Sequence, residues 1–128
     1  MKKLNEILGT RLPIIQGGMA NIATGEFAAA CSNAGALGMI ATGGWDGDRL
    51  RQEIRRAKEL TDKPFGVNLM LMNPDTERMA AVVVEEKVPV VTTGAGNPGK
   101  YIPAWKEAGI KVLPVVAASI LAKRLVNQ

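Results

Sequence analysis

Five short apolar runs recur along the chain at nearly constant spacing, and this periodicity constrains the fold more than any other feature. The runs lie at residues 13–16, 37–41, 64–68, 88–92 and 111–115, so that successive runs start 23 to 27 residues apart. Each run consists mostly of Val, Ile, Leu and Met without strict polar alternation, which is typical of strands buried on both faces of a parallel sheet. We therefore predict five parallel strands.

Helical patterns lie between these runs. An apolar stripe predicts a helix over residues 46–61. Asn73 and Asn97 each precede a proline, and the pair predicts an amide cap followed by proline at the first helical position. Gly35 and Gly109 predict left-handed helix ends. The result is five consecutive βα units in a single domain, residues 1–128, built either as a doubly wound open sheet or as about five of the eight units of a (β/α)8 barrel.

Composition excludes several classes of protein. Hydrophobic residues make up 47% of the chain and charged residues 22%, which is typical of a globular domain. The net charge of +4 is spread along the chain and aromatic residues are only 4%, so we expect no nucleic-acid partner. No apolar stretch reaches membrane-spanning length. A lone cysteine, Cys31, favours a cytoplasmic protein and is interpreted as a small buried hydrophobe rather than a nucleophile.

The carboxyl ends of the predicted strands carry residues that packing alone does not require. Three of these ends are rich in glycine, which allows close approach of a ligand to the backbone, and Asn68 ends the third strand with an amide. Met19 and Met70 add polarizable apolar surface. The set fits a planar heteroaromatic ring with an amide-like edge. It does not fit a metal, because the chain has no histidine and the strand ends hold no carboxylate cluster. The plainer alternative is a set of turn glycines with an asparagine that ties a loop.

The stretch GAGNPG, residues 94–99, matches the pattern G-x-G-x-x-G but does not make a convincing dinucleotide fingerprint. That fingerprint also requires an acidic residue about 20 positions further on, and it normally follows the first strand. Here the corresponding position lies in an apolar stretch, and the motif follows the fourth predicted strand. A glycine loop followed by a helix start explains these residues better.

Five stretches together resemble one known family. PIIQGGMA, AGALGMIA, LTDKPFGVNLML, VPVVTTGAGNP and KVLPVVAA, in this order and spacing, are similar to the FMN-dependent nitronate monooxygenase family. This family includes proteins similar to 2-nitropropane dioxygenase and the flavin-dependent enoyl-[acyl-carrier-protein] reductase II. The stretches DKPFGVNLML and TTGAGNPGKYI look closest to the reductase.

The resemblance implies a TIM barrel with FMN at the carboxyl ends of the strands. It implies that the isoalloxazine ring lies along residues 17–20, that Asn68 hydrogen-bonds the flavin, and that the end of the fourth strand lines the pocket. In the reductase, NADH or NADPH would reduce FMN and the substrate would be a trans-2-enoyl thioester; in the monooxygenase, the substrate would be an alkyl nitronate. The expected cofactor-binding residues are Gly17, Gly18, Met19, Ala20, Asn68, Thr93 and Gly94.

The chain also departs from the family pattern. Members carry a catalytic histidine beyond the fifth strand, and this chain has none, so no catalytic residue is expected within it. Phosphate-binding loops of such barrels follow strands seven and eight, which lie beyond the five predicted here. Val115 stands where the monooxygenases often have lysine, which favours the reductase. We expect an N-terminal portion that binds FMN weakly, is inactive alone, and pairs with itself or with a complementary half.

Overall fold

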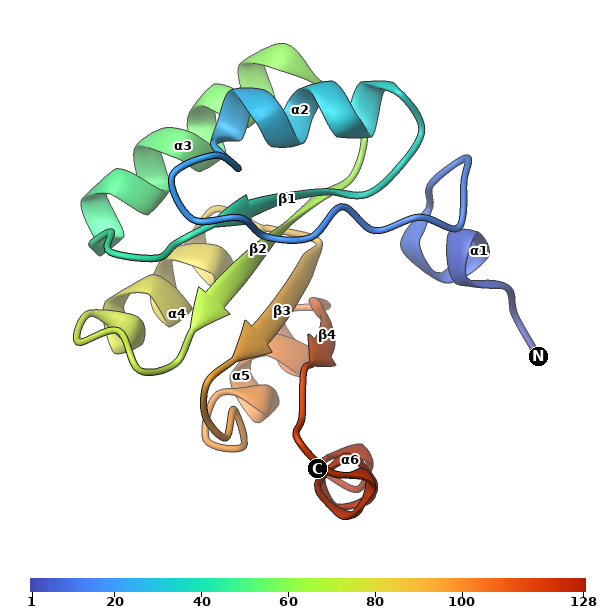
Figure 1. Ribbon diagram of the computed structural model, residues 1–128, viewed down its shortest axis with the longest axis vertical. Coiled ribbons are helices and arrows are strands. Elements are labelled where there is room, and N and C mark those ends of the chain that lie inside the picture. The colour runs from blue at the N-terminus through green and yellow to red at the C-terminus, as the bar shows by residue number, and fades with distance from the viewer.

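The computed structural model describes residues 1–128. A single parallel sheet contains four strands in the order β1-β2-β3-β4 (Figure 1). The strands are β1 (Gly38–Ala41), β2 (Phe65–Met70), β3 (Val90–Gly94) and β4 (Lys111–Pro114). The helices are α1 (Leu4–Leu8), α2 (Gly25–Asn33), α3 (Gly47–Leu60), α4 (Thr76–Glu85), α5 (Ile102–Glu107) and α6 (Ser119–Val126). No helix combines the length and the apolar character needed to cross a membrane.

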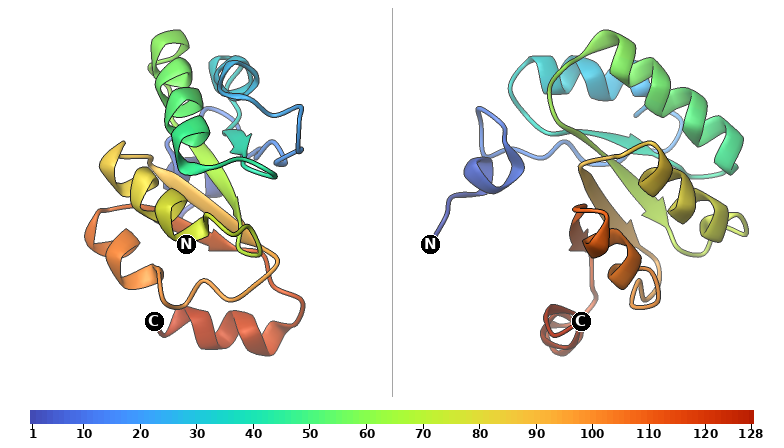
Figure 2. Two further views of the ribbon diagram at one scale, coloured as in Figure 1. Left: turned by 90° about the vertical axis from the view of Figure 1, so that its left-hand side faces the viewer. Right: turned by 180° about the vertical axis from the view of Figure 1, so that it is seen from behind.

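Strand order distinguishes between the two architectures that the sequence leaves open. The strands are neighbours in chain order without a reversal, and helices α2, α3, α4 and α5 form an arc around one side of them (Figure 2). A doubly wound sheet would place helices on both faces and would reverse the strand order at a switch point. The arrangement is therefore part of a (β/α) barrel. In this register Asn68 of β2 pairs with Ala41 of β1 on one side and with Thr92 of β3 on the other.

The first predicted strand, residues 13–16, is present only as an extended segment that forms one isolated parallel bridge, Ile15 with Leu37. The Gln16 backbone donates to the Leu37 carbonyl at 2.9 Å. The next position of the ladder is taken by a side chain, because Gln16 Oε1 accepts from the Met39 backbone N–H at 2.7 Å. The expected strand is thus wrong as a regular strand, although the segment occupies its place beside β1.

Helix starts agree with the sequence for α3 and differ from it for α4 and α5. The Asp46 carboxylate caps α3 by accepting from the Arg49 N–H at 2.8 Å. Asn73 and Asn97 are not helix caps: each accepts from the backbone N–H two residues ahead, at 2.8 and 2.9 Å, and so forms a turn before its helix. These helices consequently begin at Thr76 and Ile102, later than predicted.

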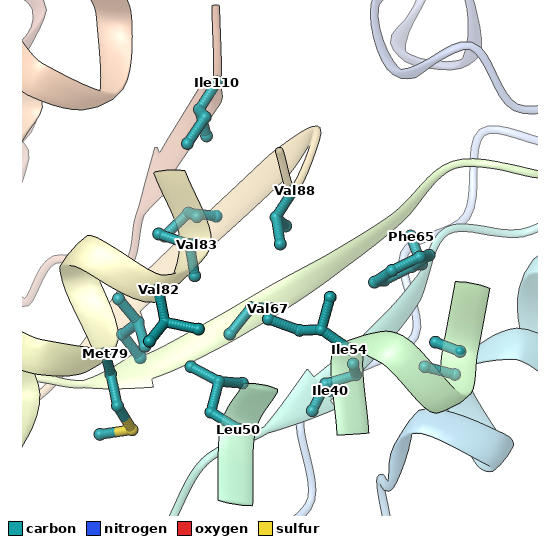
Figure 3. Packing of buried hydrophobic residues seen from close by; sticks show 14 of the residues in the cluster. Ile40, Leu50, Ile54, Phe65, Val67, Met79, Val82, Val83, Val88 and Ile110 are labelled. Carbon is teal, nitrogen blue, oxygen red and sulfur yellow. The ribbon is translucent and has the colours of Figure 1, made fainter. Parts of the chain in front are cut away.

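The main hydrophobic core lies between the sheet and its helices (Figure 3). Alternate residues of β2, Phe65, Val67 and Leu69, point into this core, and we call this side of the sheet the helix face. Asn68 and Met70 therefore lie on the opposite side, which we call the open face. Near the amino-terminal ends of the strands, a smaller cluster of Leu8, Leu37, Met39 and Val90 covers part of the open face.

Helix α2 approaches its neighbours unusually closely because its packing surface consists of small residues. A Cβ atom on Gly38 would lie 1.8 Å from the Ala28 carbonyl oxygen, so strand β1 rests directly on the backbone of α2. A Cβ atom on Gly25 would lie 2.1 Å from the Glu53 carbonyl oxygen of α3. These two glycines are required by packing and not by ligand binding.

Glu86, which directly follows α4, is a buried carboxylate surrounded by cations of α3. Its Oε1 accepts from Arg51 at 2.8 Å and from Arg55 at 3.1 Å, and Lys58 lies 3.4 Å from Oε2. Burial by itself would raise the pKa of Glu86, but the hydrogen bonds from Arg51, Arg55 and Lys58 together hold it below its ordinary value. The ionised carboxylate therefore joins α3 to α4.

We predict that Glu86→Gln lowers the free energy of unfolding by about 2 kcal/mol near neutral pH, because it removes the charge that the three cations share. A lowered pKa in the folded state means that the contribution of Glu86 is present above the unfolded pKa and is lost as the pH falls through the folded pKa. The melting temperature of the variant should therefore approach that of the wild type in acid. Glu59→Gln, which breaks an exposed pair with Arg56, is the control and should change stability by less than about 0.5 kcal/mol. Equal effects of the two substitutions would contradict this role.

Candidate functional site

Asn68 lies at the centre of the polar cluster on the open face. The Thr92 hydroxyl donates to Asn68 Oδ1 at 2.7 Å across the β2–β3 pair. The Thr42 hydroxyl, from the end of β1, donates to the Asn68 backbone carbonyl at 2.8 Å. Asn68 Nδ2 makes no hydrogen bond within the chain, and the residue is partly exposed. The amide therefore presents a free donor to whatever lies on the open face.

The segment of residues 17–20 lies against this amide. A Cβ atom on Gly18 would lie 3.0 Å from Asn68 Cβ and 3.4 Å from Nδ2. A residue with a side chain at position 18 would therefore be crowded against Asn68. A Cβ atom on Gly17 would meet nothing within 4 Å. All four residues are exposed, and none of their backbone N–H groups donates a hydrogen bond. The segment therefore offers bare backbone with free donors beside the Asn68 amide.

The other strand ends approach the same place. A Cβ atom on Gly43 would lie 3.2 Å from Ala20 Cβ, and a Cβ atom on Gly94 would meet only open space. Met19 and Met70 are 39% and 45% exposed, which leaves their polarizable apolar surface free for contact. The carboxyl ends of the strands therefore meet at one rim, as the sequence predicts for parallel strands.

Thr93 is the predicted site residue whose side chain the fold does not bring to this rim. In β3, Val91 belongs to the main core and Val90 to the open-face cluster, so strand alternation places the Thr93 side chain on the helix face. Thr93 is fully buried, and its hydroxyl oxygen has no hydrogen-bond partner. Only the backbone of Thr93 can line the rim, and its carbonyl already accepts from the Val115 N–H at 2.8 Å.

This orphaned hydroxyl leads to a prediction. Thr93→Val keeps the shape of the side chain and removes a buried polar group without a partner, so it should raise the free energy of unfolding by about 1 kcal/mol. The shift in the urea midpoint measures the effect. Thr93→Ser is the control, because it keeps the hydroxyl and deletes the methyl group, and should destabilise the chain. A lower midpoint for Thr93→Val would mean that the hydroxyl is satisfied, for example by a water molecule.

Thr92 and Gln16 both shape the rim, although neither is among the cofactor-binding residues predicted from the sequence. Thr92 orients Asn68, and the Gln16 side chain holds the 17–20 segment to β1 through the Met39 N–H. For Gln16, the available signal was a glutamine at the end of an apolar strand. For Thr92, the sequence offered two adjacent hydroxyls, Thr92 and Thr93, and did not show which of them faces the ligand.

The rim is an open surface rather than an enclosed pocket. Two cavities, of about 470 and 460 Å³, lie beside α6, and neither is lined by Gly18 or Asn68. No group of three or more His, Cys, Asp or Glu side chains is arranged to hold a metal ion. Cys31 is half-buried, not fully buried as expected, and lies on α2 away from the rim. The rim therefore offers hydrogen-bond donors and apolar surface for binding, with no acid or nucleophile among its residues.

Comparison with known sequences places this arrangement in a family. A profile described as nitronate monooxygenase matches residues 1–82. The (3aS,4S,5R,7aS)-5-hydroxy-7a-methyl-1-oxo-octahydro-1H-indene-4-carboxyl-CoA dehydrogenase of Rhodococcus jostii is 32% identical over 124 residues, which cover 97% of this chain and 35% of that protein. A probable nitronate monooxygenase of Staphylococcus saprophyticus is 48% identical over 69 residues, which cover 54% of this chain and 19% of that protein. The chain thus spans about a third or less of the length of these relatives.

Comparison with solved structures agrees. The structure of FabK from Thermotoga maritima superposes with a TM-score of 0.95 at 47% identity, and the match covers 99% of this chain and 41% of that one. A nitroalkane oxidase from Streptomyces ansochromogenes matches with a TM-score of 0.88 at 26% identity, covering 98% of this chain and 46% of that one. The superpositions agree with a partial barrel, and together with the profile match they show that the chain belongs to the nitronate monooxygenase family.

Proposed function

We propose that this chain is the FMN-binding, N-terminal part of a flavin-dependent enoyl-[acyl-carrier-protein] reductase that uses NADH or NADPH as reductant. Two independent observations support this. The rim offers free backbone donors at residues 17–20 beside the free amide of Asn68. FabK, an enoyl-[acyl-carrier-protein] reductase II, is 47% identical over nearly the whole chain.

The residues at the rim fit the flavin ring system. An isoalloxazine ring is flat and carries carbonyl oxygens and ring nitrogens along one edge, so it needs donors beside an uncluttered backbone. Gly17 and Gly94 leave open space where a Cβ atom would point, and Asn68 Nδ2 and the N–H groups of residues 17–20 supply donors. Met19 and Met70 supply apolar surface that packs well against an aromatic ring. In this proposal Gly18, Ala20 and the Thr93 backbone complete the contact surface.

The contribution of this chain to the reaction is binding and orientation. FMN, when bound, supplies electron transfer from the nicotinamide cofactor to the double bond of a trans-2-enoyl thioester. Donors at the rim would stabilise negative charge on the edge of a bound ring, and the exposed methionines would limit the access of water to it. The chain has no histidine, and the rim residues named here include no acid, so we expect the proton donor for the product to come from outside this chain.

Titration with FMN tests the proposal directly. The purified chain should quench flavin fluorescence on binding, with weak affinity because the contacts to the flavin phosphate predicted from barrel loops seven and eight are absent. Riboflavin, which lacks the phosphate, should bind about as well as FMN. An absence of binding at any flavin concentration would contradict the proposed function.

A second candidate, nitronate oxidation, is favoured by the 48% identity to a probable nitronate monooxygenase over 69 residues. Val115, which is 67% exposed just after β4, argues against it, because the monooxygenases often have a lysine there. Two assays on the full-length protein separate the candidates. NADH oxidation with a crotonyl thioester supports the reductase, and oxygen uptake with an alkyl nitronate supports the monooxygenase.

We further propose that the chain associates with a second copy of itself or with a chain that completes the barrel. The sheet is open at both edges, at β4 and at residues 13–16, and unpaired edges of this kind favour strand addition. Light scattering should therefore show a species larger than 13.6 kDa, or one that grows when the complementary half is added. A single species of that mass under both conditions would contradict the proposal.

A further inference from the structure

We infer that Thr92 is a positioning residue that determines which atom Asn68 presents to its ligand, so that the site selects a ring edge carrying hydrogen-bond acceptors. The inference rests on the proposed function for the identity of the ligand. It adds one residue that is not among the predicted cofactor-binding residues, and it predicts which kind of ring edge the site accepts.

The geometry of the amide carries the argument. An asparagine side chain offers an acceptor oxygen and a donor nitrogen of nearly equal size, so its surroundings decide which of them faces the ligand. The Thr92 hydroxyl donates to Oδ1 at 2.7 Å, within the range of a good hydrogen bond, and so retains the oxygen on the β3 side. The nitrogen is left free, without a partner in the chain.

The surroundings restrict the amide from the other sides as well. A Cβ atom on Gly18 would lie 3.0 Å from Asn68 Cβ, so this segment leaves little room beside Asn68, and the Thr42 hydroxyl donates to the Asn68 backbone carbonyl at 2.8 Å. The backbone and Cβ of Asn68 are thus held independently of Thr92. Rotation about the last torsion remains, and the Thr92 hydroxyl is the group that restrains it.

This arrangement predicts how the site discriminates. A fixed Nδ2 donor beside the free N–H groups of residues 17–20 makes the rim a row of donors, which pairs with carbonyl oxygens or unprotonated ring nitrogens. A ligand edge that presents N–H or O–H groups would meet donors only. A bound ligand that covers these donors without accepting from them would leave them unpaired, which disfavours the wrong ligand.

Thr92→Val tests the inference, because valine has the same shape and cannot donate. We expect FMN affinity to fall about tenfold, which corresponds to one ordinary hydrogen bond and the loss of preorganisation. Thr92→Ser keeps the hydroxyl and should restore most of the affinity. The matched control is Thr61→Val: the Thr61 hydroxyl donates to Asn33 Oδ1 at 2.6 Å, the same kind of pair outside the rim, and its loss should leave FMN affinity unchanged.

A second measurement does not depend on FMN. The Asn68 side-chain amide signal, assigned by its disappearance in Asn68→Ala, should show a lower NMR order parameter in Thr92→Val and a normal one in Thr92→Ser and Thr61→Val. An unchanged order parameter, or wild-type FMN affinity in Thr92→Val, would overturn the positioning role while leaving the proposed function intact. If the wild-type chain binds no flavin, the proposed function fails, and the order parameter alone decides the role of Thr92.

Discussion

Replacing Gly38 with alanine should abolish cooperative folding or lower the free energy of unfolding by about 4 kcal/mol. The added Cβ atom would lie 1.8 Å from the Ala28 carbonyl oxygen and 2.6 Å from its carbonyl carbon, far inside van der Waals contact. These are backbone atoms of α2, so no side-chain rotation relieves the clash. Helix α2 would have to move away from β1, and the core that they share would open. Urea unfolding followed by circular dichroism measures the loss.

The control for this prediction is Gly94→Ala. A Cβ atom on Gly94 would meet nothing within 4 Å, so this substitution should change the stability of the free chain by less than about 0.5 kcal/mol. In the proposed site, however, the methyl group would occupy space that the flavin ring needs, so FMN affinity should fall. The two substitutions thereby distinguish a glycine that packing requires, Gly38, from a glycine that the proposed ligand binding requires, Gly94. Equal destabilisation by the two substitutions would contradict the assignment of Gly38 to packing.

Asn68→Asp is expected to weaken FMN binding about 100-fold, and Asn68→Ala only about tenfold. Both substitutions remove the donor at the rim. The aspartate still accepts from the Thr92 hydroxyl, and it also directs a negatively charged oxygen at the acceptor edge of the ring. Alanine leaves a gap that water can fill. The ratio of the two affinities, measured by quenching of flavin fluorescence, tests whether Asn68 acts as a donor.

The dependence on pH adds a second test of the same substitution. The introduced carboxyl group becomes a donor when it is protonated, so the affinity of Asn68→Asp for FMN should rise as the pH falls toward 5. Asn68→Ala should show no such rise. Asn33→Asp is the matched control, because Asn33 also accepts from a threonine hydroxyl but lies outside the rim. A variant Asn68→Asp that binds as tightly as the wild type would exclude a donor role for Asn68.

The sequence predicted the repeating βα unit well, because a strand buried on both faces appears in the sequence as a short unbroken apolar run. Four of the five apolar runs became strands, and residues at two of their carboxyl ends, Gly43 and Asn68, lie against the 17–20 segment. The start of α3 also agrees with the helix predicted over residues 46–61, where the Asp46 side chain accepts from an N–H only three residues further on. Local contacts of this kind depend on few distant neighbours.

Predictions were wrong where a polar group had a choice of partners. Asn73 appeared to be a helix cap from its position before proline, yet its amide is held by the Trp45 carbonyl at 2.9 Å, from a segment 28 residues earlier. Residues 13–16 were predicted as a regular strand, and the Gln16 side chain replaces part of its backbone ladder. In both cases a contact distant in sequence changed the outcome.

The amino-acid sequence by itself determined the spacing of the βα units, the position of glycine and asparagine at strand ends, and the family. The tertiary structure alone decided that the strands are ordered as in a barrel, that Thr92 and not Thr93 faces the rim, and that Gly18 lies against Asn68. The physical reason is strand alternation: an unbroken apolar run does not reveal which residues face the helices. Which residues of a strand face the helices depends on packing between segments that lie 20 to 50 residues apart in the sequence. The free energy of that packing is not visible in any local sequence pattern.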